Sequence, residues 1–214
     1  MAKKEYKGID VSSWNGKPDF TKAKGLDFAI LRVTEKNGID KSFESNYKSA
    51  TEAGLKVGVY KYSYAKNSTD SKREAEEVIE TLAGRHLDFP VFLDLEWKTQ
   101  ETYTKTQISG IIESFCETIK KAGYKFGIYC NKNWYNTLIP TAAKSKYDFW
   151  IASVPSDVND DGAIHESLRP SYGVGWQYSW KGKVTGLSGG YDSNVFYTLY
   201  DDKKKETKEE EIVS

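Results

Sequence analysis

The sequence predicts an α/β protein, an irregular TIM-like barrel with eight strands and fewer than eight helices. Two observations support this fold class. First, eight short apolar runs are spread over about 200 residues, and helical patterns separate the early ones. Strand–helix–strand alternation predicts parallel pairing through right-handed crossovers, and eight such strands suggest a closed barrel. Second, the strands after Tyr147 are joined by loops without a clear helix, which makes the barrel irregular.

The first half of the chain shows the alternation clearly. The elements expected in order are a strand at Gly8–Ser13, a strand at Phe28–Thr34, a helix at Phe43–Ala53, a strand at Val57–Tyr64 and a helix at Thr69–Leu82. Gly54 supplies a C-terminal cap for the first helix. The segment Asn67-Ser-Thr-Asp70 is a plausible start of the second, because its side chains can accept hydrogen bonds from free backbone N–H groups.

The second half has more strands than helices. The elements expected in order are a strand at Val91–Trp97, a helix at Gln107–Ala122 ending at Gly123, and strands at Phe126–Asn131, Phe149–Val154, Gly175–Trp180 and Asp192–Tyr197. Residues Pro155–Tyr172 are rich in Asn, Asp, Gly and Pro, and this composition predicts one long loop.

Two segments are expected in the domain organisation. Residues 1–200 form the barrel, and the almost wholly charged residues 201–214 form a tail or linker. No apolar run approaches the roughly 20 residues that span a bilayer, so no membrane association is expected. The lysines at the start precede no apolar stretch, which indicates no signal peptide. The chain then stays where it is made, is released by another route (as from a phage-infected cell) or has lost its leader, and we expect a monomer.

The composition excludes several classes of protein. Lys plus Arg and Asp plus Glu both total 31, and this zero net charge argues against a nucleic-acid binder. Aromatic residues reach 14%, too many for a disordered chain. Cys116 and Cys130 form no disulfide framework, and their neighbours suggest two buried free thiols. The scattered Cys and His residues predict no metal site.

The run Val91–Trp97 carries two carboxylates inside an otherwise apolar strand. Side chains alternate along a strand, so Asp94 and Glu96 share the face opposite Leu93 and Leu95. If the apolar face packs against outer helices, both carboxylates point into the barrel. Burying two carboxylates is costly, and this favours a functional interpretation over a structural one.

Other expected strands carry polar or aromatic side chains near their ends. The carboxyl ends of parallel barrel strands meet at one rim, so these groups are expected to line one groove. The candidates are Asp10, Arg32, Tyr62, Tyr64, Tyr129, Asn131, Trp150, Gln177 and Asp192. Structural roles remain open for several of them. Asp10 and Asp192 also suit helix caps or loop anchors, Arg32 also suits a salt bridge to those acids, and the tyrosines also suit the core.

Paired carboxylates in a cleft edged by aromatic side chains suggest glycoside hydrolysis. One carboxyl must be protonated to give its proton to the leaving oxygen. The other must be charged to stabilise the transition state or to activate the attacking group. A neighbouring like charge raises the pKa of one member and keeps an acid available near neutral pH.

Eight ordered stretches then resemble one known family, glycoside hydrolase family 25, the Chalaropsis-type muramidases. The stretches are Gly8-Ile-Asp-Val-Ser-Ser-Trp-Asn-Gly16, Phe28-Ala-Ile-Leu-Arg-Val-Thr-Glu35, Gly58-Val-Tyr-Lys-Tyr-Ser-Tyr64, Phe92-Leu-Asp-Leu-Glu-Trp97, Gly127-Ile-Tyr-Cys-Asn-Lys-Asn-Trp134, Phe149-Trp-Ile-Ala152, Trp176-Gln-Tyr178 and Tyr191-Asp-Ser-Asn-Val-Phe196. The resemblance implies a flattened eight-stranded barrel that cleaves the β-1,4 bond from N-acetylmuramic acid to N-acetylglucosamine in peptidoglycan. It implies no metal and no organic cofactor.

The resemblance also implies roles for individual residues. Glu96 matches the family's proposed general acid, Asp94 matches its partner, and Asp10 and Asp192 match the other two acids of the cleft. The substrate contacts expected in the groove are Arg32, Tyr62, Tyr64, Tyr129, Asn131, Trp150 and Gln177. Two routes stay open for the step after protonation. The substrate's 2-acetamido group attacks with help from a carboxylate such as Asp94, or water attacks directly.

Three alternatives remain beside the muramidase. A chitinase-like barrel usually carries a further acid two residues before the Asp-x-Glu pair, and here that position is Phe92. A glucosaminidase would cut the other bond with the same carboxylates. A wall-binding module without activity would have lost Asp94 or Glu96, and both are present. A phage endolysin and a bacterial autolytic enzyme both fit as its setting.

Overall fold

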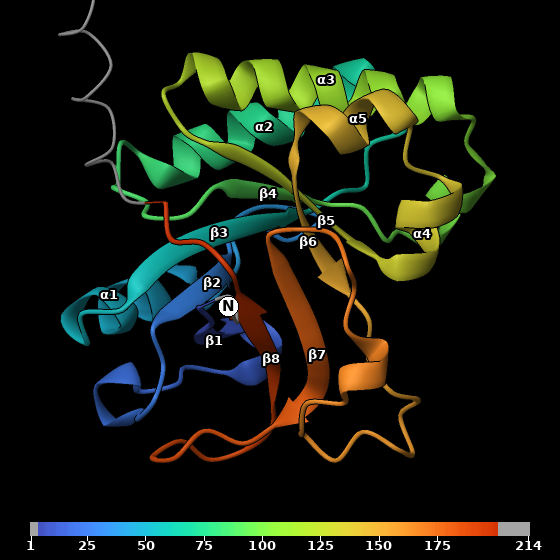
Figure 1. The fold of residues 1–214 in the computed structure, drawn as a ribbon. Helices are drawn as coiled ribbons and strands as arrows, with labels where there is room; N and C mark the ends of the chain where they lie inside the picture. The colour runs from blue at the N-terminus through green and yellow to red at the C-terminus, as the bar shows by residue number, and fades with distance from the viewer. Residues whose placement is uncertain (1–3, 201–214) are drawn as a thin grey trace, which may run out of the picture.

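The computed structural model describes residues 4–200, and the segment expected as a charged tail, 201–214, lies outside them. The strands close into a barrel in which each strand pairs with the next along the chain, as Figure 1 shows. In order, the strands are β1 Tyr6–Val11, β2 Phe28–Arg32, β3 Lys56–Tyr62, β4 Val91–Asp94, β5 Phe126–Asn131, β6 Asp148–Ala152, β7 Gly175–Gly182 and β8 Tyr191–Phe196. All eight expected strands are present, and the predicted fold class is confirmed.

The direction of the last strand differs from the prediction. β1 to β7 pair in parallel, but β8 is antiparallel to both β7 and β1. Only residues 183–190 join β7 to β8. A parallel connection needs a crossover of a dozen or more residues, so this short link reverses the chain. The expectation of parallel pairing throughout was therefore wrong for β8.

Among residues 4–200, five α-helices accompany the barrel. They are α1 Phe43–Glu52, α2 Ser68–Leu82, α3 Lys105–Lys121, α4 Lys132–Thr137 and α5 Thr141–Lys146. The three predicted helices are confirmed. The prediction missed α4 and α5, because six residues are too few to show an amphipathic period. In Figure 1, α2 and α3 lie side by side over the strands in the middle of the sequence, while no helix covers β7 and β8.

Local sequence explains where the long helices begin and end. The side chain of Asn67 accepts a hydrogen bond from the Asp70 backbone and caps α2, as predicted. Thr104 and Gln107 form a reciprocal capping box at the start of α3. Gly54 follows α1 with a φ of 71°, a conformation that favours glycine. These caps fix the helices that pack their apolar faces against the outside of the barrel.

The interior of the barrel is filled by aromatic rings. A compact inner cluster is built from Phe28, Ile30, Phe89, Phe92, Tyr129, Trp150, Ala152 and Phe196. Glycines face these rings. A Cβ on Gly8 would lie 2.4 Å from the Phe28 ring, and one on Gly175 would lie 2.5 Å from the Phe196 ring. The rings therefore fill the barrel interior, and polar side chains occupy the rim at the carboxyl ends of the parallel strands.

The structure also bears on the predicted cysteines, the predicted long loop and the search for a membrane-spanning helix. Cys116 in α3 and Cys130 in β5 are free and buried, as expected. The long loop at 155–172 is confirmed, with one 3-10 turn at Glu166–Leu168. No helix between residues 4 and 200 combines the length and the apolar character needed to cross a membrane.

Candidate active site

Four carboxylates gather at one rim of the barrel. Asp10 lies on β1, Asp94 ends β4, and Glu96 follows two residues later. Asp192 lies near the start of β8 and is the register partner of Asp10. Because β8 runs antiparallel, its first residues reach the rim where the parallel strands end. The structure therefore brings together all four acids that the sequence singled out.

The alternation that placed Asp94 and Glu96 on one face holds, although the assigned strand is shorter than expected. β4 ends at Asp94, so Glu96 lies on the following segment and not on a strand. The alternation nevertheless continues through this segment, because the Leu95 N–H donates to the Tyr129 carbonyl of β5 at 2.9 Å and Leu95 is buried in the outer core with Leu93. Asp94 and Glu96 therefore lie on the opposite face, and both line the groove.

The acids lie in a groove with a volume of about 450 Å³. Aromatic, amide and acidic side chains share its walls. The lining residues are Asp10, Ser12, Trp14, Asn15, Arg32, Tyr60, Tyr62, Tyr64, Asp94, Glu96, Tyr129, Trp150, Gln177 and Asp192. A concave site with a few convergent polar groups is the usual form of a ligand site.

Asp94 is the acid most hidden from solvent beside the groove. The residue is only 3% exposed, and its Oδ1 atom has no hydrogen-bond partner among the described residues. Burial raises the pKa of Asp94 well above its usual value, and the charges of Glu96 and Asp10 add to this effect. Arg32 opposes the rise. Asp94 thus lines the groove with a buried carboxyl oxygen that no described residue hydrogen-bonds.

Asp10 and Asp192 form a second pair across the β1–β8 contact. Burial raises the pKa of Asp10 to about 6, although hydrogen bonds from Asn194 and Gln177 oppose the rise. Burial and the charge of Asp10 raise the pKa of Asp192 to about 9. Near neutral pH the proton of this pair therefore belongs to Asp192, which donates it in a hydrogen bond to Asp10.

Glu96 combines access to the groove with a raised pKa. Its surface is exposed, but protein atoms crowd the carboxyl group on several sides. This desolvation, with the negative charge of Asp10, raises the pKa of Glu96 to about 7. A carboxyl group that is accessible and still protonated near neutral pH suits a general acid.

Six of the seven expected substrate contacts line the groove, namely Arg32, Tyr62, Tyr64, Tyr129, Trp150 and Gln177. The seventh, Asn131, lies outside the lining. Its side-chain oxygen accepts a hydrogen bond of 2.8 Å from the Trp134 backbone and caps α4. The helix that needs this cap was not predicted, so the capping role of Asn131 was missed as well.

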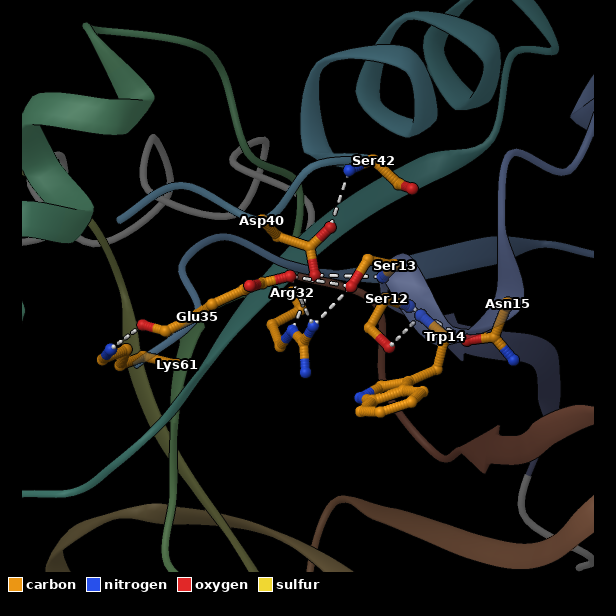
Figure 2. A network of polar contacts seen from close by, with 9 residues as sticks. All are labelled: Ser12, Ser13, Trp14, Asn15, Arg32, Glu35, Asp40, Ser42 and Lys61. Atoms are coloured by element: carbon orange, nitrogen blue, oxygen red, sulfur yellow. Dashed lines mark hydrogen bonds and ion pairs between the residues drawn. The ribbon is translucent and has the colours of Figure 1, made fainter. Parts of the chain in front are cut away.

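Arg32 is held by a polar network at one side of the groove (Figure 2). Its Nε donates to Asp40 at 2.6 Å, and its Nη2 donates to the Ser13 hydroxyl at 2.8 Å. Glu35 accepts from the same Nη2 and from Ser13. The salt bridge expected as an alternative role for Arg32 therefore exists, but its partners are Asp40 and Glu35 and not the groove acids.

Aromatic side chains form one wall of the groove. The rings of Tyr62 and Tyr64 lie 4.8 Å apart, and Trp97 meets Tyr64 edge-on at 5.6 Å. Trp14 stands at the rim with 88% of its surface exposed. Aromatic faces of this kind suit the apolar faces of sugar rings.

Sequence reasoning missed Trp14 and Asn15 as groove residues. The signal was available in the segment Ser12-Ser-Trp-Asn15, where the Ser12 and Asn15 side chains cap a 3-10 turn directly after β1. That turn leaves the Trp14 ring with no core to fill, because it projects beyond the barrel rim. The two histidines, to which no role was given, pair with Asp88 and Asp161 away from the groove.

The chain is similar to one protein family and to lysozymes within it. The family described as Glycosyl hydrolases family 25 matches residues 9–187. The autolytic lysozyme of Clostridium acetobutylicum is 31% identical over 195 residues, covering 89% of this chain and 55% of that protein. This chain therefore spans about half the length of that relative.

Two solved structures share the fold. A bacterial lysozyme from Streptomyces coelicolor is similar with a TM-score of 0.69 and 27% identity, covering 89% of this chain and 91% of that one. The modular autolysin LytC from Streptococcus pneumoniae, solved with a synthetic peptidoglycan ligand, has a TM-score of 0.74 and 25% identity. That match covers 90% of this chain and 47% of LytC.

Proposed function

The chain belongs to glycosyl hydrolase family 25, and from this membership we propose that it is a lysozyme acting on bacterial peptidoglycan. The bond cleaved is the β-1,4 bond between N-acetylmuramic acid and N-acetylglucosamine. Relatives named lysozyme and autolysin support the activity, and the peptidoglycan ligand of LytC supports the substrate. The site of action is the cell wall, the partner is a glycan strand, and the protein works as a monomer. Residues 4–200 are the catalytic barrel.

Glu96 is the proposed general acid, and the observation that carries this role is its accessible carboxyl group with a pKa of about 7. Such a group donates its proton to the leaving oxygen without a large thermodynamic penalty near neutral pH. The negative charge on Asp10 helps to keep that proton in place. Asp192 is the register partner of Asp10 and keeps a proton to higher pH.

Asp94 is the proposed partner of Glu96 in the reaction. Asp94 lines the groove, and its Oδ1 is buried without a hydrogen-bond partner among the described residues, which leaves this carboxyl group unsatisfied before substrate binds. In the substrate-assisted route it holds the 2-acetamido group, which attacks the anomeric carbon and forms a cyclic intermediate. In direct hydrolysis it orients the attacking water. The first route retains the anomeric configuration and the second inverts it, so NMR of the first product formed distinguishes them.

The experiment that tests the function is a digest of purified peptidoglycan, reduced with borohydride and analysed by mass spectrometry. New reduced muramic acid ends are the expected product. Reduced glucosamine ends would identify a glucosaminidase instead. Absence of new ends, with retained binding to the wall, would favour a non-catalytic module, and cleavage of chitin alone would favour a chitinase-like enzyme.

A further inference from the structure

Two buried amides bind the same oxygen atom of Asp10. Gln177 Nε2 and Asn194 Nδ2 each donate a hydrogen bond to Asp10 Oδ2 at 2.8 Å. Gln177 is 2% exposed and Asn194 is 0% exposed. Both amides are therefore almost fully excluded from solvent in the folded protein, and of the two only Gln177 borders the groove.

The orientation of Asn194 is fixed by its other partners. Its Oδ1 accepts a hydrogen bond of 2.9 Å from Trp150 Nε1, and its Nδ2 also donates to the Asp192 backbone carbonyl at 3.1 Å. An indole N–H can only donate, and a backbone carbonyl can only accept. The amide therefore has one orientation that satisfies every partner, and this orientation points a donor at Asp10.

Gln177 is oriented in the same way from another side. Its Oε1 accepts from the Tyr129 hydroxyl at 2.8 Å and from Trp180 Nε1 at 3.3 Å. The hydroxyl could reverse its role, but the indole could not. A rotated Gln177 amide would present its N–H groups to Trp180 and its oxygen to the Asp10 carboxylate, and both contacts would be unfavourable. Gln177 thus also offers Asp10 only a donor.

These donors favour the charged form of Asp10 over its neutral form. Charged or titratable groups line the groove together with Asp10 and come from β2, β3, β4 with its following segment, β5 and β8. They are Arg32, Tyr60, Asp94, Glu96, Tyr129 and Asp192. The phenols of Tyr60 and Tyr129 are neutral, because burial raises the pKa of each well above 10. Asp192 donates a proton toward Asp10 and so also favours its charge.

We propose that Gln177 and Asn194 are positioning residues, whose amides keep the negative charge on Asp10 and thereby leave the proton on Glu96. This inference rests on the proposed role of Glu96 as general acid. When Asp10 and Glu96 hold one proton between them, two arrangements compete. Only the arrangement with the proton on Glu96 can protonate the leaving oxygen, and the two amides select it.

Loss of one amide donor has two consequences that are separable from damage to the fold. The charge shifts from Asp10 toward Glu96, so a smaller fraction of the enzyme is competent and the maximal kcat falls. The cluster also holds its protons more tightly, so both limbs of the pH–rate profile move to higher pH. A purely structural defect would lower the profile without moving it.

The test uses two variants, each of which removes one donor while keeping the side chain's approximate volume. They are Asn194→Leu and Gln177→Met. Loss of one hydrogen bond to a charged group is expected to raise the pKa of Asp10 by about 1–2 units, and because the proton prefers Glu96 only about tenfold at the start, the maximal kcat on peptidoglycan is expected to fall about 2- to 10-fold. The profile is expected to move by about one pH unit, with KM changing less than kcat. Asn46→Leu is the matched control, because Asn46 is an equally buried amide on α1 outside the groove, and its profile is expected not to move.

A second measurement is independent of activity. NMR titration of protein labelled with ¹³C at the aspartate carboxyl groups follows Asp10, whose signal is identified by its loss in Asp10→Asn. The midpoint for Asp10 is expected to rise in both donor variants and to stay near 6 in the Asn46→Leu control. Unmoved midpoints, or a lower kcat with an unmoved profile, would overturn the inference. A raised midpoint in a protein that does not cleave peptidoglycan would instead contradict the proposed function and leave the effect of the amides on the Asp10 charge in place.

Discussion

At the scale of single residues, four carboxyl groups of one groove differ in how firmly they hold their protons. Two amides and Asp192 donate hydrogen bonds to Asp10, whose pKa is about 6. Glu96 has no such donors, and desolvation with the charge of Asp10 raises its pKa to about 7. Burial, with the charge of Asp10, raises the pKa of Asp192 to about 9. Where local environments separate the pKa values of paired carboxyl groups, the group with the higher pKa suits an acid and the group with the lower pKa suits a base.

Replacement of the acid is the first prediction at this scale. Glu96→Gln keeps the shape of the side chain but removes the proton that the leaving oxygen needs. General acid catalysis contributes about 10²- to 10⁴-fold, so the rate of peptidoglycan hydrolysis is expected to fall by that factor. Glu101→Gln, at an exposed site on a 3-10 turn outside the groove, is the control. Full activity of Glu96→Gln with an unchanged thermal transition would remove Glu96 from the mechanism.

The pH dependence of activity is the second prediction. The proposed mechanism needs Asp10 charged and Glu96 protonated, so the competent form is expected to be populated between their pKa values. Activity is expected to rise as pH increases through about 6 and to fall as pH increases through about 7. The profile of kcat on a soluble peptidoglycan fragment, measured at constant ionic strength, checks this. A rate still increasing at pH 9 would contradict both assignments.

At the scale of elements, the antiparallel β8 completes the site. Its reversal brings Asp192 and Asn194 to Asp10, 182 and 184 residues away in sequence. Gly8 and Gly175 contribute inside the barrel, because the absence of a Cβ leaves room for the Phe28 and Phe196 rings. The groove acids are therefore supported by a rigid aromatic layer.

That support gives a prediction about stability. Gly175→Ala would place a Cβ 2.5 Å from the Phe196 ring, inside a cluster that has no room to expand. Overpacking of this kind costs about 1–3 kcal/mol, and chemical denaturation is expected to show a loss of that size. Gly190→Ala is the control, because its Cβ would meet nothing closer than 3.5 Å and its φ is not in the left-handed region. Equal stability of the two variants would show that the inner layer can yield.

At the scale of the whole molecule, the active site reduces stability as pH rises. The folded-state pKa values of Asp10, Glu96 and Asp192 lie above the ordinary values of 3.8, 4.5 and 3.8. The folded protein therefore binds more protons than the unfolded chain between about pH 4 and these raised values. Since stability falls with pH wherever the folded state holds the extra protons, the groove favours folding at mildly acidic pH.

Thermal unfolding checks this sign. The Tm is expected to be higher at pH 5 than at pH 8, where Asp10 and Glu96 have lost their protons. Asp192→Asn removes the most strongly shifted of the three groups and is expected to reduce the decline. For a domain of this size each kcal/mol corresponds to about 2–4 °C in Tm. A Tm that increases steadily from pH 5 to pH 8, in wild type and variant alike, would contradict the raised pKa values.

The sequence by itself determined the eight strands, the three long helices, the buried cysteines and the identity of the four groove acids. Apolar periodicity, capping residues and the Asp-x-Glu pair are local signals, and each can be read within a short window. The direction of β8 was missed, although the short link between β7 and β8 is itself a local signal for a reversal. The capping role of Asn131 was missed because the six-residue α4 shows no amphipathic period. The partners of Arg32 depend on how β1, β2 and the following loop pack together, which no short window of sequence shows.

Tertiary structure alone decided which acid holds a proton. The pKa values of Asp10, Glu96 and Asp192 depend on burial and on neighbours such as Gln177 and Asn194, which come from strands at the other end of the chain. Electrostatic interactions act through space and strengthen where water is excluded. Residue types therefore revealed that carboxylates meet in a groove, and only the closed barrel assigned each of them its charge.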